Sequence, residues 1–219
     1  MVAAPARIAL YVHELAHTGV VSNTRSVAKT LADAGHWVDV VTAIPGGQSP
    51  VGAAHVSLLR RAGRSRAYEH AAAVPALRRY LRDQRVDLLI SMGNHGHATV
   101  WAATLGRSST KVVYRISNDL TRGAHGAPRP GLLKRWLRPR FTGRLVRDAD
   151  ALVLVSAALL AEPVLKAAHD RGKAREIVNG VDVAEARRRA NEPSPHDWPG
   201  GDEPTVIAIG RLAAQKNYP

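Results

Sequence analysis

Short apolar runs with the length of β-strands recur along this chain, and helical stretches separate them. The clearest runs are residues Arg7–Val12, Trp37–Thr42, 86–91, Lys111–Ile116 and 151–155. Most are apolar at nearly every position, which is typical of strands that are buried on both faces. Strands of this kind that alternate with helices form a parallel sheet with helices on both sides. The sequence therefore predicts an α/β protein with a Rossmann-like parallel sheet.

Helices are predicted in the intervening segments, where apolar residues recur at helical spacing. The predicted helices are residues 22–34, Arg66–Asp83, 98–105, 131–147 and 157–169. Ser22 or Asn23 would cap the first helix, and Pro75 would break the second. Three weaker strands are predicted at residues 55–59, 176–178 and 205–209.

A polar, proline-rich stretch before residue 205 predicts a division of the chain into two parts. Residues 1–183 are interpreted as an amino-terminal Rossmann-like domain, and residues 184–204 as a linker. Residues 205–219 are interpreted as the first strand and phosphate loop of an incomplete second domain of the same type.

The composition excludes several classes of protein. The chain of 219 residues is 45% apolar and 22% charged, which is enough to build a core. It has no cysteine, so a disulfide framework and a thiolate metal site are excluded. The longest apolar stretch, residues 151–161, is shorter than the ~20 residues that a membrane-spanning helix needs. The amino terminus also lacks the apolar length of a signal peptide, and we expect a cytoplasmic protein.

The chain is strongly basic, with a formal net charge of +13. An arginine-rich genome would explain this charge, and so would an anionic partner. The region between Arg129 and Arg147 has no acidic residue and carries the cations Lys134, Arg135, Arg138, Arg140 and Arg144. It is either a solvated helix face or a helix that meets an anionic membrane surface, at the inner face of the membrane. No nucleic acid partner is expected, because the sequence shows no nucleic-acid-binding motif.

Polar residues follow several of the predicted strands, where parallel sheets bind ligands. Gly19 precedes the first predicted helix and would let an anionic substrate approach the helix N-terminus. His95 follows the strand at 86–91 and could contact substrate hydroxyls or transfer a proton. Arg115 and Asn118 lie at the end of the next strand and could bind a carboxylate or phosphate and a hydroxyl. Ordinary turns and helix caps explain each of these residues equally well.

Two cations lie close together at the end of the sequence. Arg211 follows an apolar run that ends in Gly210, and Lys216 comes five residues later. Two cations on one loop past the carboxyl end of a strand are suited to holding a diphosphate.

Other motifs are absent or lie in the wrong context. The glycine-rich dinucleotide fingerprint and the P-loop motif do not occur, which disfavours a dehydrogenase or a P-loop enzyme. The segment from His13 to His17 matches the H-E-x-x-H motif of zinc proteases, with Glu14 as the general base. The match follows a strand-like run and is cut short by Thr18 and Gly19, so a zinc protease is only a remote alternative.

Three segments of the chain contain motifs that occur in a defined order. The first runs from Thr18 to Thr42 and contains the pattern L-x-x-x-G-H-x-V-x-V-x-T. The second combines A-D-A-L-V-L-V-S at residues 149–156 with N-G-V-D at residues 179–182. The third is G-R-L followed by Q-K-N, at residues 210–217. In their order and spacing these segments cover nearly the whole chain, and they resemble the large family of retaining glycosyltransferases called family 4, which has the two-domain GT-B fold.

The resemblance implies an enzyme that moves a sugar from a nucleotide-sugar to an acceptor with retention of configuration. The residues that match the donor diphosphate site are Arg211 and Lys216, with Gly19 approaching from the first domain. Charge stabilisation of this kind needs no cofactor and no obligatory metal. The acceptor would contact His95, Arg115 and Asn118.

The chain departs from the family pattern in two places. Ser117 and Asn118 stand where many relatives carry a histidine, so His95 and Asn118 are both candidates for the catalytic residue of this domain. The paired glutamates of the family would lie beyond Pro219, and we expect the chain to be inactive, or nearly so, alone. A non-enzymatic module that binds a glycan or a phosphate is the main alternative.

Overall fold

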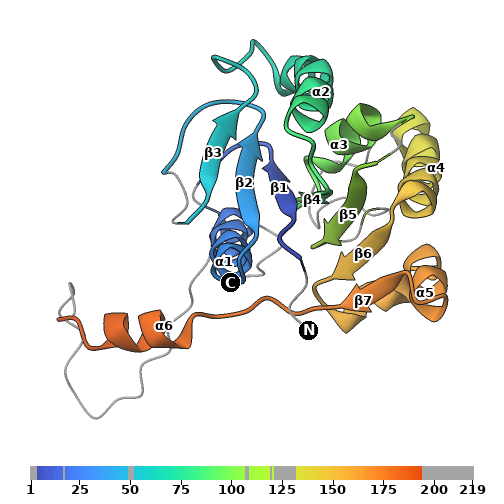
Figure 1. The fold of residues 1–219 in the computed structure, drawn as a ribbon. Helices are drawn as coiled ribbons and strands as arrows, with labels where there is room; N and C mark the ends of the chain where they lie inside the picture. The colour runs from blue at the N-terminus through green and yellow to red at the C-terminus, as the bar shows by residue number, and fades with distance from the viewer. Residues whose placement is uncertain are drawn as a thin grey trace.

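The structure is a computed structural model that describes residues 4–16, 18–48, 52–106, 109–118, 120 and 132–193. Its centre is a parallel sheet with the order β3-β2-β1-β4-β5-β6-β7 (Figure 1). The strands are β1 Arg7–Val12, β2 Trp37–Thr42, β3 Ala54–Ser57, β4 Leu88–Ser91, β5 Lys111–Ile116, β6 Ala151–Leu154 and β7 Ala174–Glu176. This is the predicted Rossmann-like sheet, and the prediction of the fold class is confirmed.

Helices pack on both faces of the sheet, as predicted. They are α1 Gly19–Asp33, α2 Arg66–Asp83, α3 His97–Thr104, α4 Leu132–Asp148, α5 Pro163–Asp170 and α6 Val183–Ala190, with a 3₁₀ turn, η1, at Ala157–Ala161. Alternate residues of β1 point to opposite faces. Ala9 and Tyr11 join a core with α2 to α5, whereas Ile8, Leu10 and Val12 pack on α1.

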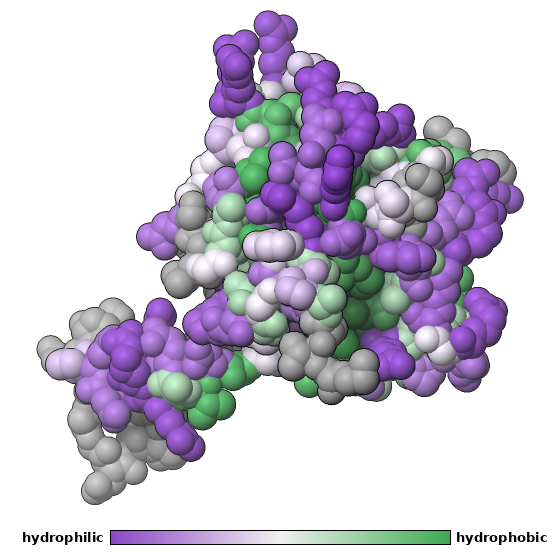
Figure 2. All heavy atoms as spheres, in the orientation of Figure 1, coloured by the Kyte–Doolittle hydropathy of each residue, from purple (hydrophilic) through white to green (hydrophobic). Residues whose placement is uncertain are grey.

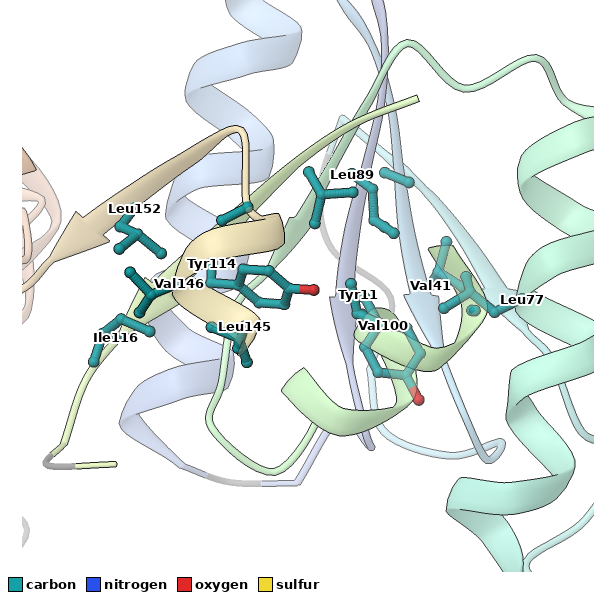
Figure 3. Packing of buried hydrophobic residues seen from close by; sticks show 14 of the residues in the cluster. Tyr11, Val41, Leu77, Leu89, Val100, Tyr114, Ile116, Leu145, Val146 and Leu152 are labelled. Carbon is teal, nitrogen blue, oxygen red and sulfur yellow. The ribbon is translucent and has the colours of Figure 1, made fainter. Parts of the chain in front are cut away.

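The larger core lies between the sheet and helices α2 to α5. Figure 3 shows Leu145 and Val146 of α4 beside Tyr114, Ile116 and Leu152 of β5 and β6, and all five residues are buried. Burial of one such apolar side chain contributes roughly 1.5–3 kcal/mol, so this layer holds the carboxyl ends of the central strands in place.

Two local predictions about the helices are corrected. The first helix begins at Gly19, not at residue 22, because Thr18 caps it: the Thr18 hydroxyl accepts from the Val21 amide. Pro75 does not break α2. The buried side chains of Ala73 and Leu77 flank the proline, and their packing offsets the one lost backbone hydrogen bond.

The end of the sheet also differs from its prediction. The helix predicted at 157–169 is divided into η1 and α5, because Pro163 starts a new helix at a position where no amide donor is needed. Strand β7 spans Ala174–Glu176 and begins two residues before the strand predicted at 176–178. Ile177 and Val178 lie beyond it and are exposed.

The segment that follows β7 extends away from the body of the protein (Figure 1). It leads into α6, a helix with no buried residue that occupies the first part of the stretch interpreted as a linker. Val181, which precedes this helix, and Val183, its first residue, are exposed. Figure 2 shows apolar surface beside the part of the molecule that carries the helix. The strand predicted at 205–209 lies outside the described residues.

Candidate functional site

The loops after β1, β4 and β5 meet at the carboxyl edge of the sheet. Their strands are neighbours in the sheet, and Tyr11 pairs with Ser91, which in turn pairs with Tyr114. The Met92 amide donates to the Tyr11 carbonyl at 2.9 Å, so the loop after β4 starts directly beside the end of β1. The topology therefore brings Gly19, His95, Arg115 and Asn118 to one edge of the sheet.

A cavity of about 260 Å³ lies at the N-terminus of α1. Its lining residues are Ala16, Thr18, Gly19, Val21, Ser22 and Arg25. A Cβ atom added at Gly19 would meet nothing within 4 Å, so the glycine is not required by packing and leaves open space at the helix N-terminus. The positive end of the helix dipole there favours an anion.

Sequence reasoning missed Ser22 and Arg25, which line the same cavity as Gly19. The three positions are spaced by three residues, which places them on one face of a helix. This signal was hidden because the helix was expected to begin at residue 22. The Arg25 guanidinium donates to the Gln48 carbonyl at 3.0 Å, which holds the cation beside the cavity.

A second and larger cavity, of about 500 Å³, lies at the opposite edge of the sheet. Arg78, Arg82 and Arg85 line it, but it lies at the C-termini of α2 and α3. Carbonyl groups point outward there and disfavour anions. The Arg78 guanidinium already donates to the carbonyls of Ala102 and Ala103. Size alone therefore does not identify the functional cavity.

Asn94 fastens the loop after β4 to the loop after β5. Its side-chain amide donates to the Asn118 carbonyl at 3.2 Å, and its oxygen accepts from the Ser117 amide at 3.3 Å. The side chains of His95 and Asn118 are exposed at this edge. Both are thus accessible to a ligand, and their assignment to the acceptor stays a prediction.

The two histidines of the loop after β4 have different environments. His97 is fully buried, and its Nδ1 is 2.7 Å from the Ser91 hydroxyl. Burial lowers the pKa of His97 to about 3, with a smaller contribution from the charge of His95, so His97 is neutral near pH 7. His97 is therefore a structural residue, whereas His95 faces solvent.

A buried pair, which the sequence did not reveal, fixes the end of β1 to α2. His13 Nε2 lies 2.9 Å from Glu69 Oε2, and the Gly63 amide donates to the other carboxylate oxygen at 2.8 Å. The hydrogen bond from His13 holds the pKa of Glu69 below its usual range. The His70 ring packs on His13 with centroids 4.5 Å apart. This pair anchors the loop that leads to the α1 cavity.

The geometry that a zinc protease requires is not found. His13, Glu14 and the two following residues form a loop rather than a helix, and His17 is outside the described residues. Glu14 accepts from the Arg66 guanidinium at 2.6 Å. In the parts of the chain that the structure describes, no three potential ligands are grouped to hold a metal ion.

Arg115 is buried, with 6% of its surface exposed. It donates to the Met92 carbonyl at 3.0 Å and to the side-chain oxygen of Asn179. Burial lowers the pKa of its guanidinium. Arg115 thus joins the loop after β4 to the segment after β7, a connection that no local sequence pattern indicates.

The basic helix α4 presents cations to solvent. Arg140, Arg144 and Arg147 are exposed, and their spacing of four and three residues puts them on one face. Phe141 instead packs edge-on against Trp101, with ring centroids 5.6 Å apart. None of the helices within the described ranges has both the length and the apolarity to cross a membrane.

Arg211 and Lys216, the residues predicted to hold a diphosphate, lie outside the described residues, as does Arg129. Their roles are therefore still predictions from the sequence.

The family of this chain follows from its match to a family model. Residues 18–180 match the model described as a glycosyl transferase 4-like domain. The chain belongs to this family. The matched residues include every lining residue of the α1 cavity except Ala16, and they include the loops after β4 and β5. No curated protein sequence matches the chain.

Solved structures of low sequence identity share the fold. A glycosyltransferase from Rickettsia africae is 18% identical with a TM-score of 0.58, over 88% of this chain and 47% of its own. Sucrose-phosphate synthase from Thermosynechococcus elongatus is 19% identical with a TM-score of 0.57, over 86% of this chain and 53% of its own. The Anabaena protein HepE was solved with UDP and glucose. It is 15% identical with a TM-score of 0.53, over 85% of this chain and 50% of its own. The chain thus spans about half the length of these solved structures.

Proposed function

We propose that this chain is the acceptor-binding part of a glycosyltransferase that uses a nucleotide-sugar donor and retains the anomeric configuration. The observation that carries the proposal is the open cavity beside Gly19, at a helix N-terminus within the matched family domain. An anionic leaving group is favoured there by the helix dipole. HepE was solved with UDP and glucose, which supports a nucleotide-sugar as the kind of donor.

The proposed roles divide between two sides of a cleft. Gly19 gives the donor diphosphate access to the helix N-terminus, and Arg211 and Lys216 neutralise its charge as it leaves. These cations make a metal unnecessary for the reaction. His95 and Asn118 are exposed and bind the acceptor, and one of them assists the transfer. Residues 205–219 would begin the donor-binding domain, residues 184–204 would form the linker, and residues 1–183 would form the acceptor-binding domain.

Gly19→Leu is the first test of this function. The change should leave the melting temperature nearly unaltered, because a Cβ atom at this position meets nothing within 4 Å. It should raise the KM for the nucleotide-sugar at least about tenfold, because the side chain fills the place of the diphosphate. Transfer is measured with the full-length protein, and Gly19→Ala serves as the smaller control.

The same assay tests the two cations. Arg211→Ala and Lys216→Ala should each lower kcat by roughly 100-fold, since they stabilise charge that develops in the transition state. A complete protein with full activity in these variants would contradict the assigned roles. If Gly19→Leu is as active as Gly19→Ala, the donor does not bind in the α1 cavity.

We also propose that α4 meets an anionic membrane surface. Arg140, Arg144 and Arg147 support this, because they form one exposed face of the helix. An interfacial arginine contributes about 1 kcal/mol to binding of anionic lipid, so Arg140→Gln with Arg144→Gln should weaken binding roughly 30-fold. Sedimentation with phosphatidylglycerol vesicles measures the effect, and Arg79→Gln with Arg82→Gln on α2 is the control. Equal binding to neutral phosphatidylcholine vesicles would refute the proposal.

A further inference from the structure

The guanidinium of Arg115 is a buried charge with neutral partners. It donates to the carbonyl of Met92 and to the side-chain oxygen of Asn179. Among the residues that the structure describes, no carboxylate forms an ion pair with it, whereas Arg66, Arg82 and Arg147 have carboxylate partners and are exposed. Removing an ion from water carries a large free-energy penalty unless an opposite charge compensates. Within the described residues, the charge of Arg115 thus has hydrogen-bond partners but no carboxylate partner.

Asn179 covers this charge from an exposed surface segment. The Ile177 amide donates to the Leu154 carbonyl at 2.8 Å and extends the ladder of β7 by one bond. From residue 178 to residue 182 the chain is exposed, and it then enters α6, which has no buried residue (Figure 1). The side chain of Asn179 can thus move away without disturbing the core, and its movement would open Arg115 to solvent.

The surroundings of Arg115 favour an anion. The loop from Met92 to Gly96 leads into the N-terminus of α3 at His97, and the positive end of this helix dipole is at the same edge of the sheet. His95 and Asn118 are exposed at this edge and offer further hydrogen bonds. An anionic oxygen that replaced the Asn179 oxygen would gain charge-assisted bonds, which are roughly twice as strong as neutral ones.

We propose that Arg115 is an anion-binding site that Asn179 covers, and that it receives a phosphate or carboxylate group of the acceptor. The site binds the anion when the segment after β7 moves aside and exposes the guanidinium. Assignment of the anion to the acceptor rests on the proposed function, but binding of the anion does not. The movement of this segment also connects occupancy of the site to the start of α6.

Equilibrium binding to the 219-residue chain tests the proposal without any sugar transfer. Thermal unfolding is followed with methyl phosphate and, separately, with acetate, against sodium chloride at equal ionic strength. The wild-type chain should be stabilised by one of the two anions, and the effective anion identifies the group. Asn179→Asp places a carboxylate on the guanidinium, so it should raise the melting temperature without ligand and weaken anion binding about tenfold or more.

Two further variants complete the test. Arg115→Met should lose the stabilisation by the anion, and Arg79→Met, which removes an exposed charge on α2, should keep it. The proposal would be overturned if the anion stabilised the wild type and all three variants equally, or if it stabilised none of them. If Arg115→Met does not fold, the comparison of Asn179→Asp with the wild type decides alone. If the protein binds the anion but does not transfer a sugar, the proposed function is rejected. The anion-binding site at Arg115 is then still supported.

Discussion

Gly47→Ala is expected to destabilise the protein by about 3 kcal/mol, because the change combines backbone strain with a collision. Gly47 has a φ of +75°, a conformation that L-residues rarely adopt. A Cβ atom there would lie 2.3 Å from the Leu15 carbonyl oxygen and 2.4 Å from the Leu15 Cβ. Leu15 is buried in the loop between β1 and α1, so this loop and the adjoining α1 cavity would have to move. Urea unfolding at pH 7 measures the loss.

Gly52→Ala separates the two causes. Gly52 has nearly the same φ, +77°, but its added Cβ would meet only the Ala32 Cβ at 3.6 Å, an ordinary contact. This control should lose only about 1 kcal/mol, the cost of the left-handed backbone. If the melting temperature falls equally in the two variants, the Cβ atom added at position 47 does not collide with Leu15. Donor binding should weaken in Gly47→Ala alone.

The second large effect is a loss of stability on acidification, caused by His97. Burial lowers the pKa of His97 from 6.5 to about 3. Between these values the unfolded chain binds a proton at this residue and the folded chain does not, so stability falls as the pH falls. The contribution is complete above pH 6.5, and about 2 kcal/mol should be lost between pH 7 and pH 5. Urea unfolding at pH 7, 6 and 5 measures this slope.

His97→Asn provides the comparison, because an amide can bond to the Ser91 hydroxyl but does not titrate. Its stability should depend less on pH in this range. Some slope should persist, since burial also lowers the pKa values of His55 and His70 and their effect has the same sign. An unchanged slope in His97→Asn would show that His97 is protonated in the folded protein.

The sequence contains enough information to predict the sheet but not the details of its ends. Strands β1, β2 and β5 have the predicted bounds, because a buried parallel strand needs an unbroken apolar run that is visible in one segment. The prediction that Pro75 would break α2 was wrong, because the outcome is not decided within one segment of the sequence. Whether a proline breaks a helix depends on the packing around it, and the buried Ala73 and Leu77 are fixed by contacts with other elements.

The sequence predicts where the candidate site lies but not which contacts its residues make. A loop that follows a parallel strand must lie at the carboxyl edge, so Gly19, His95 and Asn118 could be assigned to one region from the sequence alone. Their environments could not be assigned. His95 and His97 are two residues apart, yet one is exposed and the other is fully buried, because helix α3 starts between their side chains.

The sequence by itself determined the family, the sheet and the edge at which a ligand is expected to bind, since these follow from periodicity and from motifs within short segments. Only the tertiary structure decided which polar residues are available there. Glu69 meets His13 across 56 residues and Arg115 meets Asn179 across 64. Pairs so distant in sequence form when β1, α2, β5 and the segment after β7 come together, and the burial of each charge depends on that assembly. The burial of Arg115 against the neutral partners Met92 and Asn179 is thus a property of the fold rather than of any local sequence pattern.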